Sequence, residues 1–344
     1  MYNNIKFQIK KRLLGLASLA EVASEVIELC HSENTEGTKA YYLPNQLDKV
    51  LHTSPESNTE QELFRISERK REHASTLAYK IKNSTILHNA VYKDNYRCKY
   101  PTRKGKVIGQ KIETDTPLSM VSSFSGVQYF GHWLSDDVTT YILAEKFGTP
   151  VCKPNNAWSD KVVYADAFRQ NWENFAHGHV PELIIFQDYS QNTLKVERYK
   201  KLRKNLRDVY TPLYADQLVY IKRGHGGNNV RIVKNENEII SALQTKGFKI
   251  IDLEKMNINK VIPALLNARL VVTVEGSHAS HALYTLADNG NILLLMPPSI
   301  FTNVHKGWAE ALNISYGFVV GDSISDEAFS INIKELLLTI DLML

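Results

Sequence analysis

The 344-residue chain is poor in cysteine, lacks long apolar runs and carries no strong charge of either sign. Its three cysteines, Cys30, Cys98 and Cys152, are too far apart for a disulfide framework or a C-x-x-C metal site, which indicates a reducing compartment. No stretch of about 18 apolar residues occurs, so the sequence contains no candidate membrane span. Because the net charge is only +4, we expect no nucleic-acid partner.

Several catalytic motifs are also absent from the sequence. No G-x-G-x-x-G follows a predicted strand and no G-x-x-x-x-G-K-[ST] occurs, which excludes the usual dinucleotide and P-loop signatures and disfavours an oxidoreductase. There is no G-x-S-x-G, H-E-x-x-H or protein-kinase motif. The lack of a D-x-D triplet argues against a sugar-nucleotide site that is built around a metal ion.

What remains is the composition of an ordinary globular protein, 43% hydrophobic and 23% charged, with a length that predicts about two domains. Near the start, Lys10-Lys11-Arg12 precedes the apolar run 13–20, as in a signal peptide, but Glu21 ends that run. We therefore expect a cytoplasmic protein. Its basic first segment is predicted to be a solvated helix or to touch the inner membrane surface peripherally.

From residue 213 onward, short apolar runs alternate with helical patterns. Strands are predicted at 218–221, 248–252, 270–274 and 292–296, and Asn235 with Glu238 has the spacing of a capping box at a helix start. Such alternation predicts βαβ units and a parallel sheet. The predicted fold class is α/β, with a doubly wound domain in the second half and a less clear α/β domain before it.

The domain prediction divides the chain into four segments. Residues 1–105 are predicted to be a helical or irregular extension that packs on the first domain, which spans 106–212. Residues 213–330 form the second domain. Residues 331–344 form a C-terminal helix that returns to the first domain.

Two strand ends in the second half suit an anionic ligand, because ligands of open parallel sheets bind at the carboxyl ends of the strands. The turn Glu275-Gly276-Ser277 leads into a predicted helix whose N–H groups would favour a phosphate. A plain strand-to-helix turn would also explain these residues. The spacing of Glu275, His278 and His281 is compatible with a metal site, but no cysteine or further carboxylate lies nearby, so no metal is expected.

Arg223 and Arg231 flank the glycine-rich segment 224–230. Each guanidinium offers a planar fork of donors, and two such groups suit a diphosphate. A surface loop with solvated arginines would give the same pattern.

In the first half, His132 and Asp136 lie four residues apart in a predicted helix at 126–147, so they share a face, whereas Asp137 points about 100° away. A histidine beside a carboxylate is typical of a general base and its orienting partner. A merely ion-paired histidine would look the same. The residues alone leave open whether Asp136, Asp137 or His132 is the base.

In their order and spacing, these segments resemble glycosyltransferase family 61 over roughly residues 115–298. The residues that carry the resemblance are Gly131-His132-Trp133-Leu134-Ser135-Asp136, Tyr220-Ile221-Lys222-Arg223, Arg231 with Asn235-Glu236, and Glu275-Gly276-Ser277-His278. Eukaryotic members typically have His-Gly-Ala where this chain has Glu275-Gly276-Ser277, so the turn resembles that of a bacterial branch.

The resemblance implies two Rossmann-like domains that face a cleft, the GT-B arrangement. The C-terminal domain would bind a nucleotide-sugar donor, and the N-terminal domain a glycan or glycolipid acceptor. Asp136 would be the base, with His132 as its partner or substitute. The implied donor-binding residues are Arg223, Arg231, Glu275, Gly276, Ser277, His278 and His281.

The resulting hypothesis is an inverting glycosyltransferase that needs no metal or other cofactor and acts in bacterial surface polysaccharide synthesis, as capsule or lipopolysaccharide. The alternative is a non-catalytic protein that binds a nucleotide or a phosphosugar.

Overall fold

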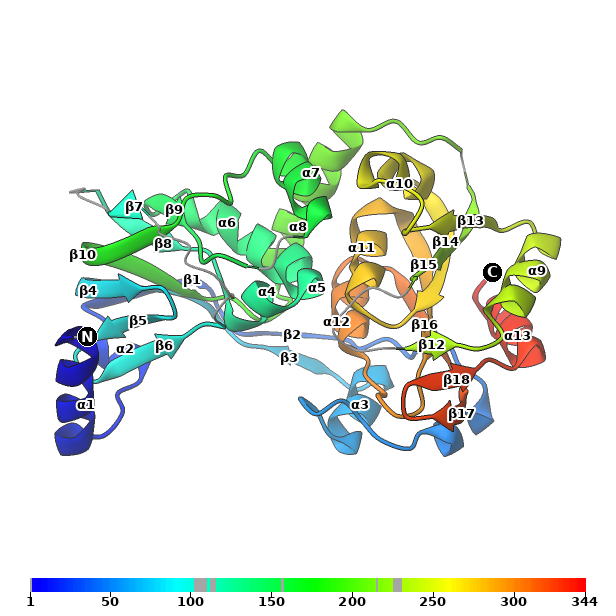
Figure 1. The fold of residues 1–344 in the computed structure, drawn as a ribbon, viewed down its shortest axis with the longest axis horizontal. Coiled ribbons are helices and arrows are strands. Elements are labelled where there is room, and N and C mark those ends of the chain that lie inside the picture. The colour runs from blue at the N-terminus through cyan, green and yellow to red at the C-terminus, as the bar shows by residue number, and fades with distance from the viewer. Residues whose placement is uncertain (1, 102–109, 112–115, 156–157, 215, 225–230) are drawn as a thin grey trace. The chain divides into compact units, whose positions relative to one another are not determined.

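The computed structural model describes residues 2–101, 110–111, 116–155, 158–214, 216–224 and 231–344 (Figure 1). The chain folds into two compact units. Unit 1 comprises Met1–Glu33 and His73–Arg198, and unit 2 comprises Asn34–Glu72 and Tyr199–Leu344. Both units combine sheets with helices, which confirms the predicted α/β class.

The main sheet of unit 1 is mixed, with the strand order β6-β5-β4-β10-β8-β9. The long strand β4 pairs antiparallel with β1, β5 and β10, whereas β8 pairs in parallel with β9 and β10. The parallel pairing of a Rossmann-like sheet is therefore confined, among the described strands of this sheet, to β10 with β7 and β8 and to β8 with β9. The strands are β1 (Glu25–Cys30), β4 (Thr76–Leu87), β5 (Ala90–Lys93), β6 (Tyr96–Lys99), β7 (Gln110–Lys111), β8 (Leu118–Met120), β9 (Thr149–Val151) and β10 (Ala176–Gln187).

The helix predicted at 126–147 is broken into short pieces. Ser123 caps the first piece, because its hydroxyl accepts the N–H of Gly126, and the chain then leaves helical geometry at Tyr129. A π-helical turn, Trp133–Asp137, interrupts the rest. The helices that begin in unit 1 are α1 (Tyr2–Leu14), α2 (Leu19–Val22), α4 (Phe124–Gln128), α5 (Phe130–His132), α6 (Val138–Ala144), α7 (Ser159–Phe168) and α8 (Thr193–Val209).

The first 105 residues are not the helical or irregular extension that was predicted. They supply β1, β4, β5 and β6 to the sheet of unit 1, with β4 in its interior. Lysines at positions 80 and 82 interrupt the apolar pattern of β4, and this masked the strand in the sequence.

Residues 34–72 belong to unit 2. They contain the 3-10 helix η1 (Pro44–Lys49) and the helix α3 (Thr59–Ile66). The backbone N–H groups of Leu51 and His52 donate to the carbonyl of Pro298, at 2.8 and 3.1 Å. The strands β2 (Glu33–Thr35) and β3 (Arg71–His73) lie at the two ends of this segment and pair with each other.

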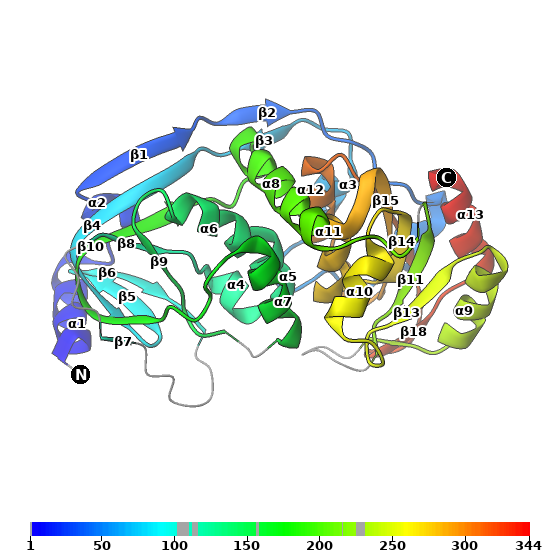
Figure 2. The same cartoon turned by 90° about the horizontal axis from the view of Figure 1, so that it is seen from above.

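Unit 2 is built on a five-stranded sheet with the order β13-β11-β14-β15-β16, and all of its pairs are parallel. Helices α9 and α13 cover one face, and α10, α11 and α12 the other, as in a doubly wound fold (Figure 2). The strands are β11 (Leu218–Lys222), β13 (Lys249–Asp252), β14 (Ala268–Val274), β15 (Leu286–Met296) and β16 (Ser315–Val320). The helices are α9 (Glu236–Thr245), α10 (Ile258–Leu265), α11 (His281–Thr285), α12 (Val304–Ala311) and α13 (Ile333–Met343), and a small sheet contains β12 (Ile232–Val233), β17 (Asp322–Ser325) and β18 (Ala328–Ser330).

The C-terminal helix α13 packs within unit 2 and does not return to the first domain. Its side chains Leu336, Ile340 and Met343 join the buried cluster that contains Tyr220 and Leu293 of the parallel sheet. The apolar stripe of this helix shows that one face is buried, but a stripe carries no information about the surface that covers it.

Within the residues that the structure describes, no helix has the length and apolar character needed to cross a lipid bilayer.

Candidate functional site

The strand order of unit 2 contains one point where the chain reverses direction across the sheet. The chain passes from β11 outward to β13 and then crosses back to β14, so the reversal lies between β11 and β14. Ligands of open α/β sheets bind outside the carboxyl ends of the strands at such a point. Ile221 pairs with Thr273, and Arg223 and Glu275 each lie two residues further on, beyond the two strand ends.

Gly276 turns the chain at the end of β14. Its φ of 151° is one that other residues rarely adopt. A Cβ atom at this position would lie 3.2 Å from both Arg231 Nη1 and His278 Nδ1. The missing side chain therefore allows a guanidinium and an imidazole to converge on the backbone of the turn.

Arg231 and Glu275 form a buried ion pair. The guanidinium contacts the Glu275 carboxylate and also donates to its backbone carbonyl at 2.7 Å. Burial raises the pKa of Glu275, and the charges of Arg231 and Arg223 oppose that rise. Glu275 thus compensates one arginine charge, and its carboxylate is not positioned as a simple contact for an anionic ligand.

Arg223 lies beside these groups. Burial and the like charge of Arg231 lower its pKa to about 10, so it remains a cation at neutral pH. Two guanidinium groups that repel each other are stabilised when an anion binds between them. The described arrangement therefore favours an anion at the β11–β14 edge.

His278 is held in one tautomer by β14. The Thr273 hydroxyl donates to the carbonyl of Ile221 at 2.8 Å and lies 2.9 Å from His278 Nε2. Since that hydroxyl has a single proton, Nε2 must be the donor. Burial and nearby positive charge lower the pKa of His278 well below its usual range, so the ring is neutral with a lone pair on Nδ1. Nδ1 faces Gly276 and can accept a hydrogen bond from a ligand N–H or O–H.

Three further predictions for this site concern Ser277, His281 and the segment 225–230. Ser277 begins a short 3-10 turn, η3 (Ser277–Ser280), in place of the long helix that was expected. His281 is only 1% exposed at the start of α11. The segment 225–230 between the two arginines lies outside the described residues.

Two residues near this edge carried no signal in the sequence. His305 of α12 places Nδ1 3.9 Å from Glu275 Oε1, and Glu62 of α3 is fully buried and accepts the backbone N–H of Asn303 at 2.6 Å. Glu62 comes from the segment 1–105 that was predicted to be an extension, and His305 belongs to no motif that the sequence analysis identified.

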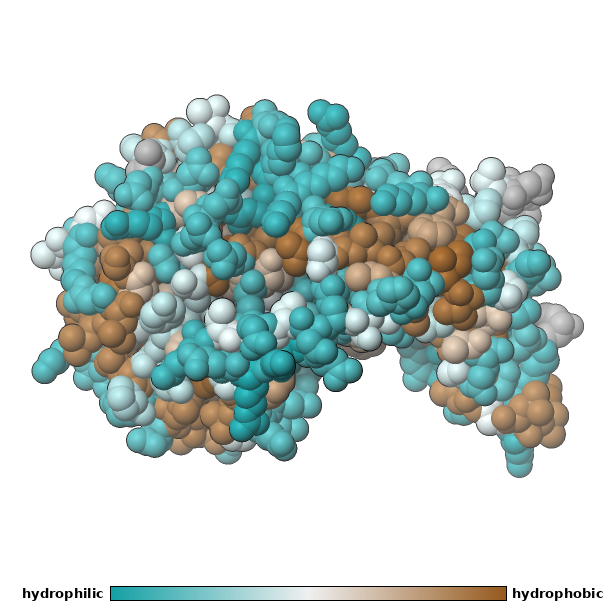
Figure 3. All heavy atoms as spheres, turned by 180° about the vertical axis from the view of Figure 1, so that it is seen from behind, coloured by the Kyte–Doolittle hydropathy of each residue, from teal (hydrophilic) through white to brown (hydrophobic). Residues whose placement is uncertain are grey.

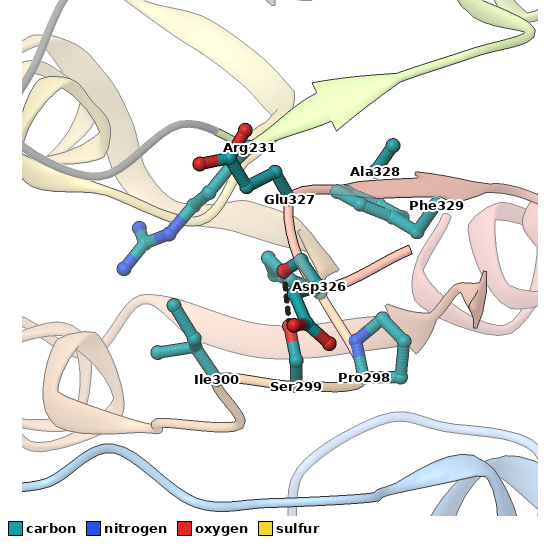
Figure 4. A pocket seen from close by; sticks show the side chains of 9 residues that line it. Arg231, Pro298, Ser299, Ile300, Asp326, Glu327, Ala328 and Phe329 are labelled. Atoms are coloured by element: carbon teal, nitrogen blue, oxygen red, sulfur yellow. Dashed lines mark hydrogen bonds between the residues drawn. The ribbon is translucent and has the colours of Figure 1, made fainter. Parts of the chain in front are cut away.

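One pocket of unit 2 lies beside Arg231, beyond the end of β15 (Figure 4). It is lined by Arg231, Pro297, Pro298, Ser299, Ile300, Asp326, Glu327, Ala328 and Phe329. This hollow encloses no space that would hold a nucleotide-sugar, so it can form only one margin of such a site.

Unit 1 contains a second polar cluster, around the π-helical turn. His132 Nδ1 lies 2.9 Å from Asp136 Oδ2, and Lys195 Nζ lies 2.8 Å from Asp136 Oδ1. The Lys195 side chain is completely buried and also donates to the carbonyl of Asp188 at 2.8 Å. The predicted His132–Asp136 pair is present, and the buried Lys195 ammonium group contacts the Asp136 oxygen that is not paired with His132.

These contacts determine the ionisation of Asp136. Burial alone would raise its pKa, but the charge of Lys195 and the hydrogen bond from His132 outweigh burial and lower the pKa to about 2. Asp136 is therefore a carboxylate at neutral pH. A carboxylate with so low a pKa is a poor base for a hydroxyl group, which suits it to orienting His132.

Asp137 points into the protein. It is 2% exposed, and its carboxyl oxygens accept the backbone N–H of Ser123 at 3.1 and 3.2 Å. Burial raises its pKa well above the usual range. These contacts hold the residue that precedes α4, so the Asp137 carboxyl group has a structural role there.

Lys195 was missed because it lies in a strongly polar stretch of α8, where a solvated face is the ordinary expectation. No group of three or more histidine, cysteine, aspartate or glutamate side chains suited to a metal ion occurs in the part of the chain that the structure describes.

Comparison with known proteins gives one family. No curated protein matches the chain significantly. The family model for glycosyltransferase 61 matches residues 130–299, a range that includes both the His132–Asp136–Lys195 cluster and the edge formed by Arg223, Arg231 and Glu275. Residues 130–299 therefore form a region of glycosyltransferase family 61.

Proposed function

We propose that the protein is an inverting glycosyltransferase that moves a sugar from a nucleotide-sugar to a hydroxyl group of a glycan or glycolipid. The observation that carries this proposal is the chain of contacts from His132 through Asp136 to Lys195, with distances of 2.9 and 2.8 Å. Such a chain suits general-base catalysis, and a non-catalytic nucleotide-binding protein would have no need of it.

In this proposal His132 is the base and Asp136 orients it. Asp136 holds the Nδ1 side of the ring, so the acceptor proton is transferred to Nε2. The negative charge of Asp136 stabilises the imidazolium that forms, as the buried carboxylate does in Ser-His-Asp triads. This reverses the roles that the sequence resemblance implied for the two residues.

The donor is assigned to the carboxyl edge of unit 2. The acceptor oxygen attacks the anomeric carbon as its proton passes to His132, and the bond from that carbon to the phosphate oxygen breaks. The electron pair leaves with the nucleoside diphosphate, whose negative charge Arg223 and Arg231 would stabilise together with the backbone N–H groups after Gly276. Because the guanidinium groups supply this charge, the reaction is proposed to need no metal ion or other cofactor.

Inversion in a single displacement requires that the enzyme bind the donor and the acceptor side by side. We therefore propose that its two halves face a common cleft, as in the GT-B arrangement. The Glu275-Gly276-Ser277-His278 turn supports assignment to a bacterial branch that acts in the cytoplasm on surface polysaccharide precursors.

Matched substitutions at the neighbouring aspartates test the proposal. Asp136→Asn and His132→Ala are each expected to reduce turnover by about 10²–10⁴-fold while nucleotide-sugar affinity stays within about twofold. Asp137→Asn is the control, because its amide oxygen can still accept the Ser123 N–H, and turnover should be retained. A protein with unchanged turnover in Asp136→Asn, or with no transfer activity at all, would contradict the assignment.

Thermal shifts with UDP-, GDP-, CMP- and ADP-sugars identify the donor class. A ligand at 100 times its Kd stabilises the folded state by about 2.7 kcal/mol and raises Tm. A selective shift that persists in EDTA is expected. A shift that EDTA abolishes would contradict the metal-free mechanism, and the absence of any shift at millimolar concentrations would contradict the donor site.

A further inference from the structure

The N-terminal helix α1 is attached to unit 1 through its middle part. Phe7 is 1% exposed and packs against Ala90 and edge-on against Tyr92, with ring centroids 5.4 Å apart. The Arg97 guanidinium lies over the Phe7 ring, and Lys10 forms an ion pair with Asp94. The helix is therefore held on the β5–β6 hairpin.

Beyond these anchors, the end of the helix exposes large apolar side chains that we call the α1 tip. Its members are Ile9, Leu13, Leu14 and Leu16, with 56, 76, 71 and 61% of their surfaces exposed. Ile9 and Leu13 lie four residues apart in the helix, so they project from one side of it. Leu16 follows Gly15, whose φ of 79° ends the helix. Figure 3 shows apolar side chains gathered over the position of α1, at the lower right. Contiguous exposure of this kind marks an interaction surface.

Within residues 1–20, which contain the α1 tip, every charged side chain is basic. Lys11 and Arg12 are exposed beside the leucines, and the first acidic residue of the chain is Glu21. An apolar edge flanked by lysine and arginine is the composition of helices that lie in the interface of an anionic bilayer. The apolar side chains enter the boundary of the acyl chains, while the cations contact lipid phosphates.

We infer that the α1 tip docks the protein on an anionic lipid surface. This inference goes beyond the proposed function and does not depend on it. Within unit 1, α1 and α5 lie at opposite ends in both views, so lipid contact at the tip leaves the His132 cluster uncovered (Figures 1 and 2).

Co-sedimentation of the full chain with vesicles tests the inference. The protein should bind vesicles of phosphatidylcholine mixed with phosphatidylglycerol and should bind pure phosphatidylcholine at least about tenfold more weakly. The double variants Leu13→Asp/Leu16→Asp and Lys11→Glu/Arg12→Glu should each lose at least about tenfold in binding to the anionic vesicles. All of these positions are exposed, so Tm should stay unchanged.

Two matched controls separate the tip from general surface effects. Leu338→Asp/Leu342→Asp changes leucines of α13 that are 45 and 54% exposed, and Lys200→Glu/Lys201→Glu makes the same charge change on α8. Both should bind vesicles as the original chain does. Absent binding, equal binding to the two vesicle types, or tip variants that bind normally would overturn the inference. So would a dimer in light scattering that dissociates in Leu13→Asp, because a second copy would then cover the tip.

Discussion

Lys195 shows how one buried side chain controls the chemistry of another. It has no exposed surface, and its ammonium group lies between the Asp136 carboxylate and the Asp188 carbonyl. The Asp188 carboxylate is itself held by both terminal nitrogens of Arg198, at 2.6 and 2.7 Å. This rigid support keeps Asp136 ionised and fixes its direction toward His132. We therefore regard Lys195 as a positioning residue.

Replacing Lys195 with Met should change both stability and the pH dependence of activity. The pKa of Asp136 lies at about 2, below the value of about 3.9 expected in the unfolded chain, so the ion pair stabilises the fold above that value. That contribution is lost as the pH falls toward 2. Lys195→Met should cost about 3 kcal/mol at neutral pH, and the difference from the original chain should narrow below about pH 4.

The activity of Lys195→Met should fall at a higher pH than that of the original chain, because burial then raises the pKa of Asp136 unopposed by the lysine. Thermal unfolding and turnover measured across pH check both effects. Lys200→Met, an exposed position of the same helix, is the control. Lower stability with an unchanged pH profile would mean that Lys195 is only structural.

At the scale of elements, the strand ends of unit 2 concentrate polar groups because parallel strands present all their carboxyl ends on one edge. The turn after β14 contains Gly276, with a φ of 151°. Its glycine allows Arg231 and His278 to approach the same backbone segment. Local backbone geometry therefore determines the arrangement of both side chains.

Gly276→Ala should weaken donor binding as well as stability. The new methyl group would force a strained backbone, which costs about 1–3 kcal/mol, and would press on two groups at 3.2 Å. Gly247→Ala is the matched control, because Gly247 has a φ of +85° and nothing within 4 Å of its added Cβ. Calorimetric titration with a nucleotide-sugar should show weaker binding only in Gly276→Ala. Equal affinities in the two variants would remove the turn from the donor site.

At the scale of the whole molecule, the chain crosses between the two units more than once. Residues 34–72 leave unit 1 and become part of unit 2, where Glu62 accepts the backbone N–H of Asn303, and the Pro298 carbonyl accepts those of Leu51 and His52. The segment 73–105 then supplies β4 to the interior of the unit 1 sheet. The first 105 residues are thus integral to both units.

A chain that begins at residue 106 should therefore fail to fold. It would lack the strand that pairs with β10 from Gly178 to Gln187, and unit 2 would lose α3. Soluble yield and circular dichroism provide the measurement. A chain that begins at Ala17, which removes only α1, should unfold cooperatively near the original Tm. A soluble, cooperatively unfolding 106–344 chain would restore the view of residues 1–105 as an extension.

Much of unit 2 could be predicted from the sequence. Its strands are continuous apolar runs bounded by turn residues, because a parallel sheet buries both faces of each strand. That local signal located β11, β13, β14 and the end of β15, and it placed Arg223 and Glu275 at strand ends that share one edge.

The remaining features depend on partners that are distant in sequence. Contacts with segments far along the chain determine four of these features. They are the burial of Lys195, the inward direction of Asp137, the central place of β4 and the packing of α13 in unit 2. A local pattern can indicate that a face is buried, but it does not identify the surface that buries it. The sequence by itself determined the fold class and most of the candidate residues, whereas only tertiary packing decided the charge of Asp136 and hence its proposed role beside His132.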